Sequence, residues 1–313
     1  MRPRDFAALV LLGALWGATF LFVRIAGPSL GPFVLTAARF LLAGAATFAV
    51  AAALGARPRL RARWRGYLIL GGANAALPSV LLVVATLQLN ASLAAILNAT
   101  GPVWAAIVAA FWLKDPLTGS KILGLILGIV GIGLLAGWSP IPVDLGFVVG
   151  VVFTTLAMCC YAIGAAYASK AFREVPSQTI AAGQLLTAGL VLVPPALLTL
   201  PNERPSGRVI LTLLALAFVS TALAYGLYFR LLRSVGPTKT SSVTFLIPVF
   251  GILWGVVFLD ESINLGTVVG LAVILAGVVL VTEFRLRAPA RPDRRTASAV
   301  IETAGGPSGG DRT

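Results

Sequence analysis

The segment NATGPVWAAIVAAFWLKD, from Asn98 to Asp115, decides the fold because its design returns as TFLIPVFGILWGVVFLDE, from Thr244 to Glu261. Both segments are almost wholly apolar, carry a proline in their interior and end in charged residues. At an offset of 146 positions, Pro102 falls on Pro248 and Asp115 falls on Glu261. A repeat of this kind predicts that the chain consists of two related halves.

The composition predicts a membrane protein. The chain has 313 residues, of which 58% are hydrophobic and 11% charged, and its mean hydropathy is +0.95. A soluble domain carries about 25% charged residues, and a helix that crosses the hydrocarbon needs about 20 apolar ones. Ten apolar runs approach that length: 6–26, 32–54, 67–88, 91–113, 119–137, 145–168, 177–199, 209–231, 240–259 and 265–282. Because these long runs do not alternate with period two, they predict an all-α membrane protein with ten transmembrane helices.

The basic residues predict how the chain is oriented. If the N-terminus is cytoplasmic, 20 of the 24 Lys and Arg residues fall in inside segments, and only Arg24, Arg204 and Arg208 fall outside. The positive-inside rule therefore places both termini in the cytoplasm of a multi-pass protein of the cell membrane. We interpret the net charge of +13 as a topology signal next to the lipid bilayer, and not as a site for nucleic acid. Residues 284–313, rich in Arg, Pro, Gly and Ser, are expected to form a disordered basic cytoplasmic tail.

The two halves are expected to be inverted relative to each other. We place them at residues 1–140 and 141–283, with five helices each. Because five is odd, the second half enters the membrane from the opposite side. Inverted repeats are typical of secondary transporters, which bind their substrate between the two halves.

The duplicated proline has two interpretations. Proline lacks an N–H and clashes with the carbonyl four residues earlier, which belongs to Asn98 in one half and to Thr244 in the other. The proline could cause a purely structural kink, in which a neighbouring helix donates a hydrogen bond to the freed backbone carbonyl. Alternatively, Pro102 and Pro248 are hinges beside a wet cavity. The pairing of proline with a polar residue in both halves favours the cavity and the hinge.

The chain resembles the drug/metabolite transporter superfamily, and specifically its EamA-like family. The resemblance covers about residues 6–282 and rests on GALWG (13–17), ARF (38–40), ASLAAILNATGPVWAAIVAAFWLKDPLT (91–118) and SSVTFLIPVFGILWGVVFLDE (241–261). It implies a ten-helix secondary carrier that moves small metabolites and often exports amino acids or related compounds. Asp115 stands where this family commonly has Glu, so the charge is kept.

The candidate substrate-binding residues are polar or aromatic side chains deep in the predicted spans. They are Trp16, Arg39, Asn74, Asn98, Trp104, Tyr161, Gln184, Ser220, Tyr225 and Thr244. Arg39 either extends toward the membrane interface or contacts an anion or carboxylate. The aromatic residues either pack or line a cavity wall, and the neutral polar residues bond either a helix or the substrate.

Two further features leave alternatives open. Asp115 and Glu261 end their spans on opposite faces, where they either cap helices or act as a gate or proton site. No acidic residue lies in the middle of a span, so ion coupling is either absent or routed through these two ends. Small-xxx-small motifs such as Gly124–Gly128 either pack helices within the bundle or form the seam of a homodimer.

The residues argue against catalysis. The chain has no histidine and no phosphate-binding loop of the Gly-x-x-x-x-Gly-Lys-Ser/Thr type, so we predict no enzyme, no catalytic residue, no metal site and no cofactor. The prediction is a secondary transporter, and by family resemblance an exporter, that moves small-molecule substrates by alternating access. A passive small-solute channel and a non-transporting membrane scaffold are the alternatives.

Overall fold

The structure, a computed structural model, describes residues 2–53, 55, 63–114, 116, 118–137, 144–172 and 175–282. Asp115 and the expected tail at 284–313 lie outside these residues. All regular structure in the described part of the chain is helical. This confirms the prediction of an all-α protein.

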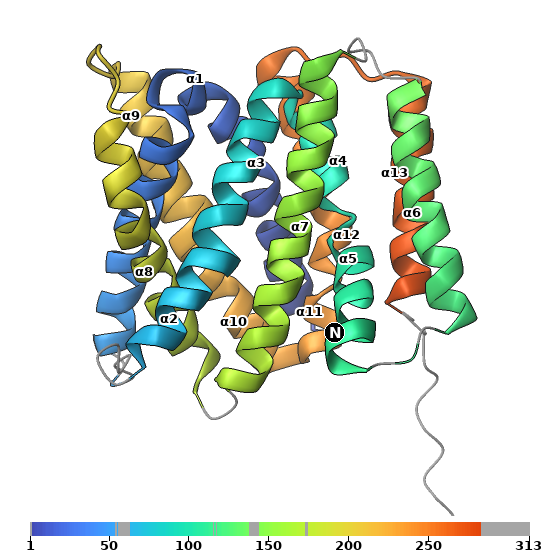
Figure 1. Ribbon diagram of the computed structural model, residues 1–313, viewed down its shortest axis with the longest axis horizontal. Helices are drawn as coiled ribbons and strands as arrows, with labels where there is room; N and C mark the ends of the chain where they lie inside the picture. The colour runs from blue at the N-terminus through green and yellow to red at the C-terminus, as the bar shows by residue number, and fades with distance from the viewer. Residues whose placement is uncertain are drawn as a thin grey trace, which may run out of the picture.

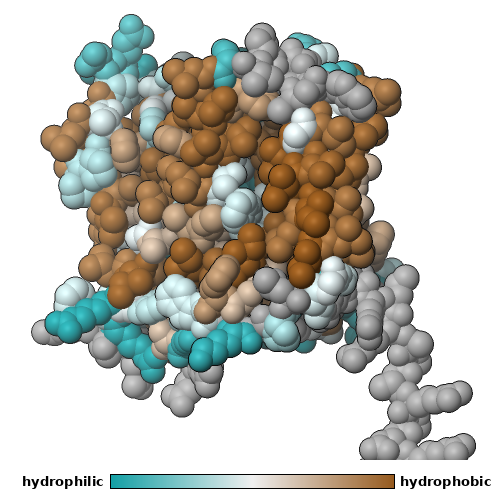
Figure 2. All heavy atoms as spheres, turned by 45° about the vertical axis from the view of Figure 1, so that its right-hand side comes forward, coloured by the Kyte–Doolittle hydropathy of each residue, from teal (hydrophilic) through white to brown (hydrophobic). Residues whose placement is uncertain are grey.

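The helices agree with the predicted spans to within a few residues. Six helices are long and apolar enough to cross a membrane: Pro3–Ala53, Trp64–Gln88, Ala91–Trp112, Leu145–Ala171, Gln178–Leu198 and Gly207–Val235. Three shorter apolar helices are Gly119–Leu135, Val243–Leu259 and Leu265–Val281. Large apolar side chains face outward, including Phe111 (82% exposed) and Leu198 (86% exposed). Figure 2 shows these apolar residues as a band between hydrophilic ends, which is the surface of a multi-pass membrane protein.

The first element, α1 (Pro3–Ala53), contains the first two predicted spans. The predicted spans 6–26 and 32–54 leave residues 27–31 between them, but in the structure the helix continues to Leu30. The backbone leaves helical geometry only at Gly31, with φ 70° and ψ 167°, a region that residues with a side chain rarely adopt. Pro32 follows directly and restarts the helix, since proline suits a first turn that needs no N–H.

The remaining elements follow one another between the two ends of the molecule (Figure 1). They are α2 (Trp64–Gly71), η1 (Gly72–Ala76), α3 (Leu77–Gln88), α4 (Ala91–Asn98), α5 (Gly101–Val108), η2 (Ala109–Leu113), α6 (Gly119–Gly137), α7 (Leu145–Ala171), α8 (Ser177–Leu198), α9 (Gly207–Leu214), η3 (Ala215–Leu223), α10 (Ala224–Val235), α11 (Pro237–Thr240), α12 (Val243–Leu259) and α13 (Leu265–Val281). The elements η1, η2 and η3 are π-helical.

The contact between α1 and α8 is reciprocal. A Cβ on Gly44 would lie 2.7 Å from the backbone nitrogen of Leu186, and a Cβ on Gly189 would lie 2.8 Å from the backbone nitrogen of Leu41. Gly189 and Leu186 are each 145 positions after Gly44 and Leu41. The same contact therefore occurs twice with the partners exchanged, as in an isologous interface.

The helices α6 and α13 form a second reciprocal pair, at the right of Figure 1. A Cβ on Gly124 would lie 2.5 Å from the Gly277 carbonyl oxygen, and a Cβ on Gly131 would lie 3.2 Å from that of Gly270. The offset of 146 carries Gly124 onto Gly270 and Gly131 onto Gly277. These glycines thus allow close packing within one chain, which was one of the two interpretations of the small-xxx-small motifs.

The two proline-bearing segments differ. In the first half, α4 ends at Asn98 and α5 starts at Gly101, so the helix is broken two residues before Pro102. In the second half, Pro248 lies inside the continuous helix α12, and the interruption falls earlier, between α11 and α12. An interruption thus precedes Pro102, whereas Pro248 leaves its helix continuous.

Candidate functional site

Two of the π-helical segments contain residues that the sequence offset of 146 pairs with each other. Asn74 lies in η1 and Ser220 lies in η3, and these residues are 146 positions apart. A π-helical turn widens the backbone and is frequent at functional sites. In η3 the widening has a direct consequence, because the Thr221 hydroxyl donates to the carbonyl of Leu216, five residues earlier, at 2.7 Å.

Arg39 is bound to this widened turn. Its Nε donates a hydrogen bond of 2.8 Å to Oγ1 of Thr221. The phenol groups of Tyr161 and Tyr225 lie close enough to interact electrostatically with the guanidinium. The guanidinium carbon also lies 5.3 Å from the centre of the Phe40 ring. Arg39 thus points into the protein, where side chains from both halves surround it.

The hydrogen bonds and ring contacts around Arg39 join α1, α3, α7, η3 and α10. The hydroxyls of Tyr161 and Ser79 are 3.4 Å apart. The Trp16 and Tyr225 rings meet edge to face, with centroids 6.2 Å apart, and the Trp16 and Tyr228 centroids are 5.5 Å apart. We call this group the Arg39 cluster, and it consists of Trp16, Arg39, Ser79, Tyr161, Thr221 and Tyr225.

Gln184 and Asn74 form a neighbouring contact between the halves. Nε2 of Gln184 donates to the Asn74 carbonyl oxygen at 3.4 Å. One turn further along α8, the Thr187 hydroxyl donates to the Tyr67 carbonyl oxygen at 2.9 Å. Both bonds link α8 to the span of α2 and η1, so Gln184 lies at a helix–helix contact.

The other predicted residues lie apart from these contacts. Asn98 is the last residue of α4, Trp104 lies in α5 and Thr244 lies in the first turn of α12. The described residues offer no hydrogen bond to Nε1 of Trp104 or to Oγ of Ser220, although both atoms are buried. The structure therefore groups Trp16, Arg39, Tyr161 and Tyr225 without joining Asn98, Trp104 and Thr244 to them.

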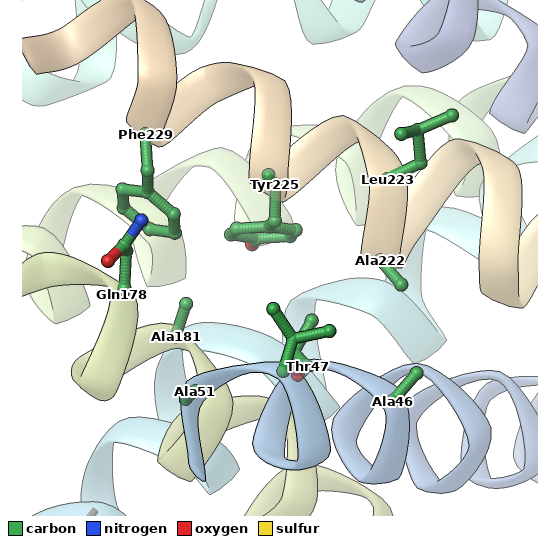
Figure 3. Close-up of a pocket in the computed structure, with 11 residues that line it drawn as sticks. Ala46, Thr47, Ala51, Gln178, Ala181, Ala222, Leu223, Tyr225 and Phe229 are labelled. Atoms are coloured by element: carbon green, nitrogen blue, oxygen red, sulfur yellow. The ribbon is translucent and has the colours of Figure 1, made fainter. Parts of the chain in front are cut away.

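A cavity of about 300 Å³ lies between α1, α8, η3 and α10. Figure 3 shows Tyr225 and Phe229 of α10 and Gln178 of α8 across it from Thr47 of α1. Its lining is mostly apolar: Ala46, Thr47, Val50, Ala51, Gln178, Ala181, Ala222, Leu223, Tyr225, Gly226 and Phe229. Tyr225 belongs both to this lining and to the Arg39 cluster, so the polar cluster adjoins an apolar space.

Glu261 lies at the end of the molecule opposite the N-terminus. Its carboxylate accepts hydrogen bonds from the backbone amides of Ala91 and Ser92 at 2.6 and 2.9 Å. The Ser92 hydroxyl donates to the same carboxylate at 2.5 Å. Glu261 therefore caps the N-terminus of α4, where free amides and the helix dipole favour an anion. Capping was one of its two predicted roles.

Several residues of the site escaped the sequence interpretation. Ser79 could have been found from the sequence, because the offset of 146 pairs it with the candidate residue Tyr225. Thr221 could not have been found in this way, because the same offset pairs it with Ala75, which is apolar. The cavity residues Thr47, Gln178 and Phe229 come together only through the packing of three helices.

Comparisons with known proteins agree on a family. Residues 6–137 and 148–283 match the EamA-like transporter family. The transporter YvbV of Bacillus subtilis is 27% identical over 90% of this chain and 92% of the relative. A probable amino-acid metabolite efflux pump of Salmonella typhimurium is 26% identical over 93% of this chain and 99% of the relative. A crystal structure 21% identical aligns with 90% of this chain and 98% of its own, at a TM-score of 0.63, and so shares the fold.

Proposed function

Because the chain belongs to the EamA-like transporter family, we propose that it is a secondary transporter that exports small metabolites, such as amino acids or related compounds, by alternating access. The observation that carries this proposal is the origin of the Arg39 cluster. Trp16, Arg39 and Ser79 come from one half of the chain, and Tyr161, Thr221 and Tyr225 come from the other. A substrate bound there would be held between the halves, as alternating access requires.

We further propose two inverted repeats at residues 1–140 and 141–283, with ten spans in all. Six long and three short apolar helices, with the first divided at Gly31, agree with that number. The reciprocal glycine contacts of α1 with α8 and of α6 with α13 support a pseudo-two-fold axis, because such an axis exchanges the two members of each pair. Both pairs join a helix of the first half to its repeat in the second half.

We place both termini in the cytoplasm. In Figure 1 the N-terminus shares one end of the molecule with the last turns of α1, α7 and α10 and with the end of the span formed by α5 and η2. The described residues at or next to these helix ends include Arg63, Arg65, Lys114, Lys121, Lys170, Arg233 and Lys239. The opposite end carries, among the described residues, the acidic residues Asp144, Glu203, Asp260 and Glu261 and only three basic ones, Arg24, Arg204 and Arg208. This asymmetry supports an orientation with the basic end inside the cell.

In this proposal the proline-bearing segments act as hinges and their charged ends act as gates. The break before Pro102 supports a hinge between α4 and α5. The contact of Glu261 with α4 supports a gate, because it fastens the second half to the first at the outer end. Asn98, Trp104 and Thr244 would meet the substrate only when these segments move, and the role of Asp115 stays a prediction.

Purified protein in liposomes tests the function. A screen of metabolites inside and outside cells with and without the gene supplies the candidate substrates. Counterflow into liposomes preloaded with unlabelled substrate then distinguishes a carrier, which exchanges and saturates, from a passive channel. Flux that neither saturates nor responds to preloading contradicts the carrier. Absence of flux for every candidate would favour a non-transporting scaffold.

A further inference from the structure

Arg39 is a membrane-embedded cation without a protein counter-ion among the described residues. The acidic side chains there are Asp5, Asp144, Glu203, Asp260 and Glu261, and all five lie at helix ends or in connections. The only hydrogen bond from Arg39 to the described residues goes to a neutral hydroxyl, that of Thr221. A charge in this setting is costly unless it is paired, so Arg39 has an unmet requirement for an anion.

Most of the hydrogen-bond donors of Arg39 have no partner among the described residues. Arginine has five N–H donors, and Thr221 accepts only the one on Nε. The two terminal nitrogens keep their four donors in the planar fork that fits a carboxylate with two parallel bonds. Arg39 is half-buried and lies in the second span of α1, seven residues after Pro32, where it faces other helices. The phenol groups of Tyr161 and Tyr225 lie near the guanidinium, and their hydroxyls are of a kind that can donate to an anion bound there.

The space beyond the cluster is apolar. The cavity of about 300 Å³ starts at Tyr225 and at Ala222, which directly follows Thr221 in the chain. Thr47 lies eight residues after Arg39, two helical turns along the same face of α1. An aromatic pair, Tyr225 and Phe229 with centroids 6.0 Å apart, lines one side. The described lining has no charged side chain.

We propose that the substrate is an amphipathic monocarboxylate, whose carboxylate pairs with Arg39 and whose apolar body occupies this cavity. The inference rests on the proposed transport function and narrows its substrate class. No described carboxylate adjoins the cluster to take an ammonium group, so an acid should bind more tightly than an amine of the same shape. The anion completes the charge pair that the chain itself leaves incomplete.

Three probes with one apolar body and different head groups test the proposal: 3-phenylpropanoate, its amide and 3-phenylpropylamine. Binding to the purified full chain in nanodiscs is measured by titration calorimetry. We expect the acid to bind about 10-fold or more tightly than the amide or the amine, since a charge-assisted bond is lost. Equal binding of acid and amide, or preference for the amine, overturns the proposal.

Variants then assign the effect to residues. Arg39→Gln should abolish the preference for acid over amide, and Arg39→Lys should keep part of it, because lysine retains the charge without the fork. The matched control is Arg230→Gln, which removes an exposed arginine of α10 and should leave the binding of all three probes unchanged.

Ala46→Phe fills the cavity, so it should weaken the binding of 3-phenylpropanoate. It should leave the binding of propanoate, which has the same carboxylate without the ring, unchanged. An acid preference that survives in Arg39→Gln contradicts the assignment, and the unfolding temperature of each variant verifies that it is folded.

Counterflow separates this inference from the transport function. If the acid binds through Arg39 but no substrate crosses the membrane, the binding site stands and the transport function fails. If other metabolites are exchanged while the acid shows no preference over its amide, the transport function stands and the substrate class is wrong.

Discussion

Glu261 and Ser92 are joined by two hydrogen bonds to one carboxylate oxygen, from the Ser92 amide at 2.9 Å and from its hydroxyl at 2.5 Å. The two residues are 169 positions apart, in opposite halves of the chain. Glu261 directly follows Asp260, which has the left-handed backbone (φ 52°) that ends α12. The end of α12 thus delivers an anion to the start of α4, and one contact fastens the two proline-bearing segments together.

Glu261→Gln should weaken this fastening. The glutamine side chain has one acceptor oxygen and no charge. It therefore loses part of the hydrogen bonding to Ala91 and Ser92, which we expect to contribute about 1–3 kcal/mol to stability. We expect a lower unfolding temperature, measured by scanning fluorimetry in detergent. The control is Asp260→Asn, because Asp260 is exposed and asparagine tolerates left-handed backbone. An equal loss in both variants would contradict a specific role for Glu261.

The reciprocal packing of α1 and α8 makes a symmetric prediction. Gly44→Ala and Gly189→Ala should each lower the unfolding temperature, and by similar amounts, because each new Cβ meets the backbone of the other helix. Gly133→Ala is the control, since a Cβ there meets nothing within 4 Å. If only one of the two substitutions destabilises the protein, the two glycines do not contribute equally to stability, and the prediction fails.

Thr221 is expected to position Arg39. Thr221→Val keeps the shape of the side chain but removes the acceptor of the Nε–H bond, so the guanidinium should turn away from its present orientation. We expect a KM for transport raised about 10-fold, with a smaller change in kcat. Thr221→Ser should restore the KM, because its hydroxyl can accept the same bond. A KM in Thr221→Val equal to that of the wild type would contradict the prediction that Thr221 positions Arg39.

The two prolines should respond differently to alanine. Pro248→Ala restores an N–H inside the continuous α12, where the Thr244 carbonyl can accept it, so the unfolding temperature should rise. Pro102→Ala should not give this gain, because a turn already separates Asn98 from α5. If flexibility at Pro248 serves transport, counterflow should slow in the Pro248→Ala variant. Identical effects of both substitutions on stability would contradict the asymmetry described above.

Much of the architecture follows from sequence pattern alone. The apolar runs predict the helices to within a few residues, since lipid allows no other way to satisfy the backbone. The connection between the first two spans was less predictable. The predicted spans left residues 27–31 outside any helix, yet only Gly31 departs from helical geometry. The resemblance to EamA-like transporters is confirmed by the family match over both halves.

The candidate site was only partly predictable. Deep polar and aromatic residues pointed to Arg39, Trp16, Tyr161 and Tyr225, which do lie together. Nothing in the sequence linked Thr221 to Arg39, because their bond depends on the π-helical widening of η3. Trp104 looked equivalent to Trp16 as a deep aromatic residue, but the structure leaves it in α5, apart from the Arg39 cluster.

Sequence by itself determined that this chain is helical and apolar enough to span a membrane, and it predicted a duplication, because hydropathy and spacing are local properties that need no knowledge of neighbours. Tertiary structure alone decided which side chains of the two halves meet and that Glu261 caps α4. It also decided that Arg39, which has no counter-ion among the described residues, lies near Tyr225, a residue that lines an apolar cavity. These facts depend on how helices far apart in the chain cross and rotate against one another. Hydropathy fixes which segments enter the membrane, and side-chain packing fixes which faces touch.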